Sequence, residues 1–261
     1  MIESIKSWNG KLIEIVRSRG ASKTQAVLNP YENLIKTGIV PWPPPEIVQK
    51  LCQSNQASAF ADSDRDSLQK NLGYYCDLQS LNSEDAITWS VFGTTAYSQP
   101  RGRSIFVKSL MELAGLGSYA GGEAIISLWR RQPHPDTLVS GGPEIDFLIQ
   151  TAQLVVFGEA KWGSGIGKGQ GKMGGDTQID IRRKLFENYA HKIYGKSIVF
   201  VLLGVSIKGN MLEGCKDNSE RHIFYSDIKW GDVCNLKTHP LSNEVNAYYT
   251  WKRLNSTTSG K

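Results

Sequence analysis

Two acidic residues and one lysine lie close together near the middle of the chain, on two short apolar segments. The segments are Glu144–Gln150 and Leu154–Lys161, and they contain Asp146, Glu159 and Lys161. Both are rich in Ile, Val, Leu and Phe and are separated by only three residues, a pattern that predicts a β-hairpin with a loose loop. Paired carboxylates next to an ammonium group could bind a divalent cation and act on an anionic substrate.

The spacing of these residues fixes how they would face one another. Residues opposed in an antiparallel pair have a constant sum of residue numbers, and Asp146 and Glu159 sum to 305. The centre of the hairpin then falls between Ala152 and Gln153, inside the expected loop. Opposed Cβ atoms lie roughly 4.5–5.5 Å apart, so both carboxylates could reach one cation. Strand alternation puts Lys161 on the same face as Glu159.

This arrangement is suited to hydrolysis of a phosphodiester. Carboxylate oxygens are hard ligands that favour Mg²⁺ or Mn²⁺. A bound metal ion lowers the pKa of its water and neutralises charge on the phosphate oxygens. A nearby lysine can stabilise the charge that develops in the transition state. An isolated Glu-x-Lys triplet is common by chance, so the facing aspartate is what makes the pattern informative.

The elements around the hairpin predict an α/β fold with a mixed central sheet flanked by helices. Ser197–Ser206 is a continuous apolar run, typical of a strand buried on both faces. Thr177-x-x-Asp180 matches a capping box at a helix start. The remaining expected elements are helices beginning near residues 83, 104 and 122, a helix over 177–194, a short strand over 223–225 and a helix over 245–252.

The first part of the chain is expected to be a helical extension, residues 1–103, with one helix and an ordered arm over 1–40. Within it, Pro41–Pro45 predicts an extended connector, because proline fixes φ and removes backbone donors. The core would then cover residues 104–254, and the polar residues 255–261 would form a flexible tail.

Charge is concentrated beside the hairpin. The chain carries a net charge of +5, and residues 160–196 hold eight Lys or Arg against three acids, which accounts for the whole excess. A basic segment of this kind attracts a polyanion. The residues expected to contact phosphates are Lys168, Lys172, Arg182 and Arg183.

Other features narrow the class of protein. The four cysteines form no CxxC pair, so reduced thiols are expected rather than a zinc knuckle or a disulfide framework. The sequence shows no signal peptide and no run of roughly 20 apolar residues. We therefore expect a soluble, cytoplasmic protein without a membrane partner.

The motif as a whole resembles that of the PD-(D/E)XK nuclease superfamily. Asp146 is followed by twelve residues and then by Glu159-Ala160-Lys161, and the resemblance covers roughly residues 104–207. Glu123 matches an additional acid that many members carry before the hairpin. Gln178 matches the glutamine of a Q-x-x-x-Y element, although Arg182 stands where that tyrosine would be. The literal Pro-Asp pair is also absent, since Glu144 follows Pro143.

The resemblance implies a restriction-endonuclease-like core and a Mg²⁺-dependent (or Mn²⁺-dependent) nuclease, with DNA expected over RNA as the substrate. Asp146, Glu159 and the Ala160 carbonyl would hold the metal, and Glu123 would hold a second metal or its water. Lys161 would stabilise the transition state, and Gln178, Arg182 and Arg183 would face the phosphate or orient Lys161. A homodimer or a larger nucleoprotein assembly is a possible working form.

Two alternatives remain open at this point. The chain could be a non-catalytic nucleic-acid-binding subunit that keeps the nuclease fold. It could also be a partner-dependent subunit that is inactive alone. The glycines at 169, 171 and 174 formally match a dinucleotide fingerprint, but the expected strand-borne acid does not follow.

Overall fold

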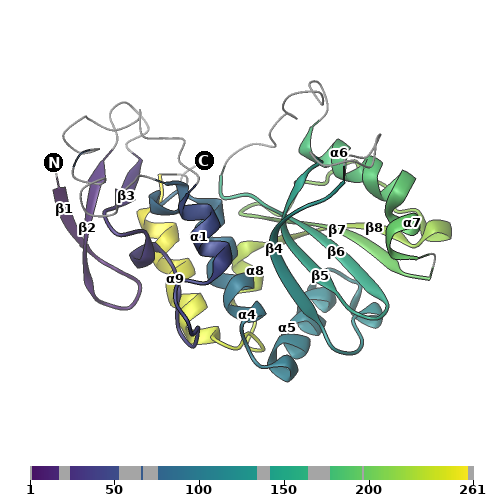
Figure 1. Cartoon of the computed structure of the whole chain (residues 1–261), viewed down its shortest axis with the longest axis horizontal. Coiled ribbons are helices and arrows are strands. Elements are labelled where there is room, and N and C mark those ends of the chain that lie inside the picture. The colour runs from purple at the N-terminus through teal and green to yellow at the C-terminus, as the bar shows by residue number, and fades with distance from the viewer. Residues whose placement is uncertain are drawn as a thin grey trace. The chain divides into compact units, whose positions relative to one another are not determined.

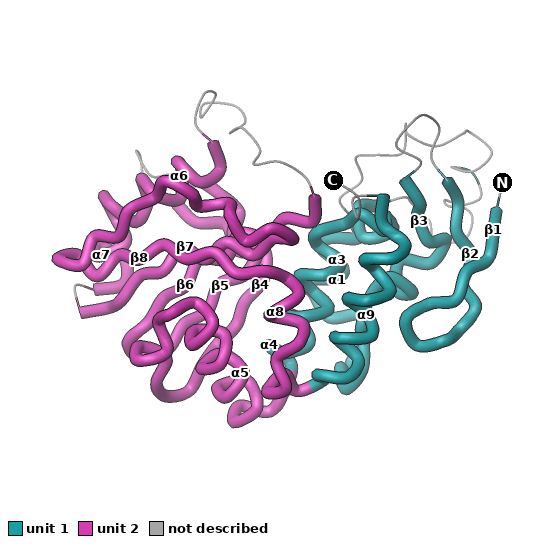
Figure 2. Tube along the Cα trace, turned by 180° about the vertical axis from the view of Figure 1, so that it is seen from behind, with its two compact units in different colours: residues 1–97, 241–261 teal, residues 98–240 magenta. Residues whose placement is uncertain are grey.

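The computed structural model describes residues 2–17, 24–52, 66, 76–133, 142–163, 177–195 and 197–257. The chain divides into two compact units (Figure 2). Unit 1 consists of residues 1–97 and 241–261, and unit 2 consists of residues 98–240. Within the described ranges, no helix has the length and hydropathy needed to cross a bilayer.

Unit 2 is built on a five-stranded mixed sheet (Figure 1). The strands follow the spatial order β4-β5-β6-β7-β8, the same as their order in the chain. β5 pairs antiparallel with both β4 and β6, whereas β7 pairs parallel with both β6 and β8. The strands are β4 (Ile125–Arg131), β5 (Glu144–Gln150), β6 (Leu154–Ala160), β7 (Val199–Ser206) and β8 (Ile223–Lys229). The expected α/β class and mixed sheet are confirmed.

The register of the predicted hairpin is also confirmed. Phe147 pairs with Gly158 and Leu148 pairs with Phe157, so the residue numbers of each pair sum to 305. A side chain at Gly158 would overlap the ring of Phe147, so the close packing of these opposed residues requires glycine. The hairpin therefore has the register that the local sequence predicts, with Asp146 and Glu159 near the same end.

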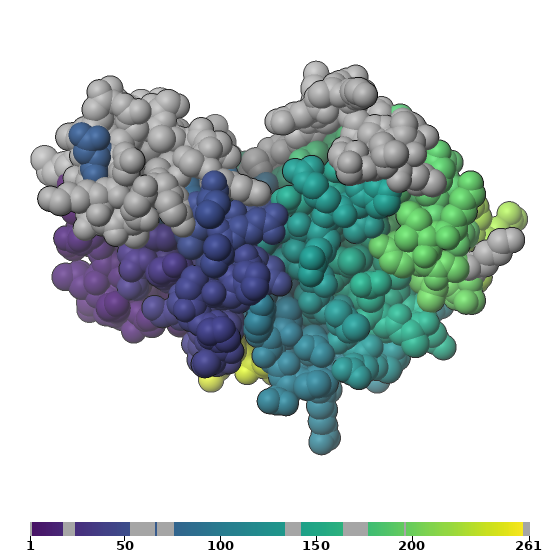
Figure 3. All heavy atoms as spheres, viewed as in Figure 1, coloured from purple at the N-terminus to yellow at the C-terminus, as the bar shows by residue number. Residues whose placement is uncertain are grey.

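One face of the sheet is covered by a helical segment that follows β6. The segment comprises α6 (Gln178–Leu185), a π-helical turn (Phe186–Ala190) and α7 (His191–Tyr194). The ring of Phe186 lies 4.6 Å from that of Phe157 and 5.8 Å from that of Phe200, measured between centroids. In the space-filling view, the teal atoms of the hairpin region adjoin the green atoms of this segment (Figure 3). The predicted helix over 177–194 is thus correct in extent, with a π turn in its middle.

The other face of the sheet carries α5 (Pro100–Leu113), which buries Phe106, Val107, Leu110 and Met111 (Figure 1). Ser226 Oγ donates to the Ala114 carbonyl and ties β8 to the end of this helix. The expected helix near residue 104 is therefore present. Shorter elements of unit 2 are η5 (Gly117–Tyr119), η8 (Ser219–Arg221) and α8 (Trp230–Cys234).

The helix expected from Gly122 is wrong, because these residues form β4. The sequence placed Ile125, Ile126 and Trp129 at helical spacing, yet the strand buries alternate positions at its start. A short apolar run fits both periods, and pairing with β5 decides in favour of the strand. Glu123 accordingly precedes a strand and is not on a helix.

Unit 1 contradicts the expected N-terminal helix. Residues 2–27 form an antiparallel sheet of β1 (Ile2–Lys6), β2 (Leu12–Arg17) and β3 (Gln25–Val27), apart from the residues that the structure does not describe. In β2, Ile13 and Ile15 are buried while Leu12 and Glu14 are exposed. That alternation is the period of a half-buried strand.

The other regular elements in the described ranges of unit 1 are helices. Ser83 caps α3 (Glu84–Thr88) through a 3.1 Å hydrogen bond from the Ala86 amide, which confirms the predicted helix start. The proline run does not stay extended: the chain bends over 40–43, and α1 begins at Pro45. The remaining helices are η1 (Pro30–Asn33), α1 (Pro45–Leu51), η3 (Asp77–Gln79), a π turn (Trp89–Gly93), α4 (Thr94–Ala96) and α9 (Ser242–Asn255). The structure groups α9 with unit 1, whereas the sequence assigned it to the core.

Candidate active site

Glu159, at the end of β6, is buried between two cations. Its side chain is 1% exposed. Lys161 Nζ lies 2.9 Å from Glu159 Oε1, and Arg182 Nη2 lies 2.5 Å from Glu159 Oε2. Both cationic side chains are also buried, at 7% and 3% exposure. Charges in the interior are costly unless they are paired, so this cluster depends on all three residues.

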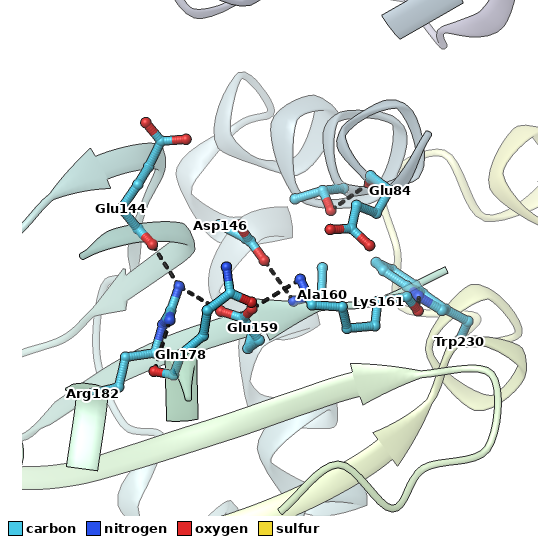
Figure 4. A network of polar contacts seen from close by, with 10 residues as sticks. Glu84, Glu144, Asp146, Glu159, Ala160, Lys161, Gln178, Arg182 and Trp230 are labelled. Atoms are coloured by element: carbon cyan, nitrogen blue, oxygen red, sulfur yellow. Dashed lines mark hydrogen bonds and ion pairs between the residues drawn. The ribbon is translucent and has the colours of Figure 1, made fainter. Parts of the chain in front are cut away.

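Asp146 approaches the same end of β6 from the neighbouring strand (Figure 4). Its Oδ2 atom accepts a 2.7 Å hydrogen bond from the amide of Ala160, the residue between Glu159 and Lys161. The predicted grouping of Asp146, Glu159, Ala160 and Lys161 is therefore present in the structure.

Backbone contacts hold Lys161 where β6 ends. Its amide donates to the Val205 carbonyl over 2.9 Å and extends the parallel pairing with β7 by one residue. Its carbonyl accepts a 3.0 Å hydrogen bond from Trp230 Nε1, and Trp230 is fully buried. The lysine backbone is thus fixed at the end of β6.

Arg182 reaches the site from α6. Its Nη1 donates to the Gln178 carbonyl over 2.9 Å, and its Nη2 donates to the Glu144 carbonyl over 2.6 Å. The guanidinium therefore joins α6, β5 and Glu159. Arg182 was expected to contact a nucleic-acid phosphate. Such a contact requires an exposed side chain, whereas Arg182 is buried.

The other predicted residues of α6 lie at its first two turns. Gln178 follows the capping residue Thr177, whose hydrogen bonds to Asp180 hold the pKa of that carboxyl below its usual value. Gln178 Oε1 is buried and has no hydrogen-bond partner among the residues that the structure describes. Arg183 is 41% exposed, 3.5 Å from Asp180, and is the accessible cation of the predicted pair. Lys168 and Lys172 lie outside the described residues.

Glu123 is not brought to the cluster. It lies two residues before Ile125, which pairs with Gln150 at the opposite end of β5 from Asp146. Its side chain is 69% exposed and lies 3.7 Å from Arg103 Nη2. Four residues of strand at roughly 3.3 Å each separate Gln150 from Asp146 along β5.

Trp129 lies beside the cluster, which the sequence did not indicate. By the register of β4 and β5 it faces Asp146, between the pairs Leu128–Phe147 and Arg130–Ile145. Its φ is +50°, a left-handed conformation that is unfavourable for a bulky residue, and its side chain is 3% exposed. Backbone strain of this type costs of order 1–3 kcal/mol and clusters at functional sites.

A fourth acid, Asp227, was also missed by sequence reasoning. It pairs across the sheet with Gly204, which in turn pairs with Glu159. A Cβ at position 204 would overlap Asp227 Oδ1, so this glycine makes room for the carboxylate. Asp227 Oδ2 accepts the Leu212 amide over 2.7 Å, and burial raises the pKa of Asp227. The carboxylate thus holds the turn that follows β7.

The cluster offers oxygen donors from two carboxylates, and each oxygen of Glu159 lies beside a cation in the structure. Among the described ranges, no group of three or more His, Cys, Asp or Glu side chains is placed to hold a metal ion. Asp146, Glu159 and the Ala160 carbonyl would thus supply oxygen ligands only. Mg²⁺ is commonly bound by one or two carboxylates and keeps several waters, so this set matches its needs.

A shallow cavity lies elsewhere on unit 2. It has a volume of about 680 Å³ and is lined by Arg101, Ser104 and Lys108 of α5 and by the loop 117–122. None of the predicted site residues lines it. The chemistry of the carboxylate cluster, and not this cavity, therefore defines the candidate active site.

Comparison of the chain with protein-family models, with curated proteins and with solved structures found no match in any of the three.

Proposed function

We propose that this protein is a Mg²⁺-dependent (or Mn²⁺-dependent) nuclease with a restriction-endonuclease-like core, acting on DNA. The observation that supports it best is the hairpin register. It brings the Asp146 carboxylate to the Ala160 amide, between Glu159 and Lys161. A metal ion held by two carboxylates can activate a water and stabilise charge on the phosphate in phosphodiester hydrolysis.

Each residue of the cluster has a distinct role in this proposal. Asp146 and Glu159 hold the metal ion with the Ala160 carbonyl. When bound, the metal supplies an activated water and neutralises charge on the phosphate. Lys161 donates to the phosphate oxygens as charge accumulates, an electrostatic contribution that is larger in a site shielded from water. Its ammonium lies 2.9 Å from Glu159 Oε1, within the cluster.

The accessible cation of α6 contributes to substrate binding. Arg183 lies on the exposed side of the helix that covers the cluster. Contacts between such residues and the phosphate backbone position a nucleic acid without reading its sequence. Cutting both strands with one site per chain would further require a homodimer or a larger assembly.

One observation favours the second candidate, a non-catalytic nucleic-acid-binding subunit. Both oxygens of Glu159 lie next to cations in the structure. A purely structural ion cluster would have the same contacts. The two candidates differ in whether the carboxylates are needed for cleavage or only for stability.

The test incubates purified protein with circular, linear and single-stranded DNA, with and without Mg²⁺. We expect metal-dependent cleavage. Asp146→Asn should abolish it while DNA binding without metal stays equal or becomes tighter, because a charge that repels phosphate is gone. Lys161→Ala should keep metal binding and lose about 10²–10³-fold in rate, as removal of an electrostatic group typically does.

Three results would contradict the proposal or redirect it. Full cleavage by Asp146→Asn would remove the assignment to this site. Binding without cleavage by the wild type under all metal conditions would favour the non-catalytic subunit. Cleavage that appears only with an added partner protein would identify the partner-dependent form.

A further inference from the structure

The cavity between α5 and the loop 117–122 of unit 2 has the features of a binding site of its own. Four side chains of α5 line it at the spacing i, i+3, i+4 and i+7, namely Arg101, Ser104, Ile105 and Lys108. Residues at this spacing share one face of a helix. The volume of about 680 Å³ falls within the range of roughly 300–1,000 Å³ that is usual for small-molecule sites. The cavity is separate from the carboxylate cluster, none of whose residues lines it.

The lining of this cavity is positively charged. Arg101 and Lys108 are exposed, and neither forms an ion pair within the described part of the chain. No Asp or Glu is found among the described residues that line the cavity. Of the two acids closest in the chain, Glu123 lies 3.7 Å from Arg103 Nη2, and Glu112 does not line the cavity. Two cations without a neighbouring acid attract an anion.

Hydrogen-bond donors are available on both sides of the cavity. Ser104 Oγ accepts the Ala124 amide over 3.1 Å, so the hydroxyl is held in place and its hydrogen can still donate. On the loop side, the amides of Gly121 and Gly122 form no hydrogen bond with other described residues. A Cβ at Gly121 would meet no atom within 4 Å, so packing does not explain this glycine. A glycine allows a ligand to approach the backbone closely.

We propose that this cavity binds a small organic phosphate of about the size of a mononucleotide. Arginine binds phosphate oxygens through its planar fork, and lysine adds a point charge. The three acceptor oxygens of a phosphate match this set of donors better than the two oxygens of a carboxylate. Ile105 is 45% exposed between the two cations and provides an apolar contact for the carbon part of the ligand. This site goes beyond the proposed nuclease function and does not depend on it.

Calorimetric titration of the full-length protein with adenosine monophosphate, inorganic phosphate and adenosine tests the proposal. Adenosine monophosphate should bind more tightly than inorganic phosphate, because its nucleoside also covers Ile105. Adenosine, which lacks the phosphate, should not bind detectably. Arg101→Gln should weaken the binding of adenosine monophosphate by about tenfold, and the double variant with Lys108→Gln by about 100-fold, since each removes a charge-assisted hydrogen bond. Lys208→Gln is the matched control, an exposed lysine of unit 2 that does not line the cavity.

A second variant separates loss of the site from loss of the fold. Ile105→Glu places a carboxylate four residues after Arg101 and three residues before Lys108. Opposite charges at these spacings stabilise a helix, so the free energy of unfolding should stay equal or rise. The same carboxylate neutralises the cations and repels phosphate, so binding of adenosine monophosphate should be lost.

Several outcomes would overturn the inference. One is an unchanged affinity for adenosine monophosphate in the double variant, which would place its site elsewhere. Others are equal affinities for adenosine monophosphate and adenosine, or no binding of either phosphate compound at millimolar concentration. If the double variant weakens only DNA binding, the cavity belongs to a nucleic-acid surface instead. All these measurements record binding, so they are independent of whether the protein cleaves DNA.

Discussion

A buried lysine of unit 2, Lys161, and a fully buried lysine of unit 1, Lys252, have different partners. In unit 2, Lys161 faces the carboxylate of Glu159. In unit 1, Lys252 on α9 is fully buried, and its Nζ donates to the Leu81 carbonyl over 2.8 Å. Burial lowers the pKa of Lys252 to about 7, and the charge of Glu84 offsets only part of that effect. A carbonyl dipole thus offsets only part of the free-energy cost of burying an ammonium. A carboxylate offsets more of it, because it supplies a full opposite charge.

The first prediction removes the carboxylate that faces Lys161, so that this lysine becomes more like Lys252. Glu159→Gln leaves Lys161 and Arg182 buried without an anion between them. We expect a loss of about 3–5 kcal/mol in the free energy of unfolding, since breaking a buried ion pair leaves an uncompensated charge. Urea denaturation of the full-length protein measures it. The matched control is Glu112→Gln, an exposed position on α5 of the same unit. Equal stability of Glu159→Gln and wild type would mean that the cluster is not a structural unit.

The second prediction removes the buried charge from unit 1. Because the pKa of Lys252 is lower in the folded state than in the unfolded state, the unfolded chain binds more protons between about pH 7 and pH 10.5. This group therefore destabilises the fold below pH 7, and its effect diminishes as pH rises. Lys252→Met should raise the free energy of unfolding by about 2–4 kcal/mol at pH 6 and by less at pH 9.

Unfolding midpoints of the variant and the wild type at pH 6, 7, 8 and 9 test the direction of this pH dependence. The difference between the methionine variant and the wild type should shrink steadily across the series. Lys237→Met, at an exposed position in unit 2, provides the control for the substitution itself. A constant difference at all four pH values would show that Lys252 does not titrate in this range.

The smallest effect concerns a cation outside the interior. Arg183 lies next to Arg182 but is 41% exposed, with Asp180 3.5 Å away. Arg183→Gln should change stability by less than about 1 kcal/mol, because exposed ion pairs contribute little. It should instead reduce the slope of log affinity for DNA against log salt by about one phosphate contact. An unchanged slope would mean that DNA docks elsewhere.

The hairpin and its site could be predicted because the information is local. Two apolar segments and a short loop determine which residues face each other, and the structure has the same register. The capping box at Thr177 and the start of α3 at Ser83 are local signals of the same kind. Such patterns require no knowledge of distant contacts.

The predictions from sequence were wrong where contacts between residues far apart in the chain determine the structure. Ile125–Arg131 has a period that fits a helix until β5 pairs with it, and the left-handed Trp129 leaves no trace in its residue type. Arg182 is an arginine on a basic helix, a pattern typical of a phosphate contact. Its burial depends on Glu144 and Glu159, which come from strands far earlier in the chain. Sequence spacing could not indicate that charge pairing would draw it inward.

The division of the chain also has a consequence for biosynthesis. Unit 2 is one continuous segment, whereas unit 1 needs both residues 1–97 and α9 near the C-terminus. Domains begin to form during synthesis, at roughly 5–20 residues per second. The carboxylate cluster can therefore assemble on the ribosome while unit 1 still lacks α9, with its buried Val245, Tyr248 and Lys252. A chain truncated after residue 240 would keep every residue of the carboxylate cluster but would lack the helix that completes unit 1.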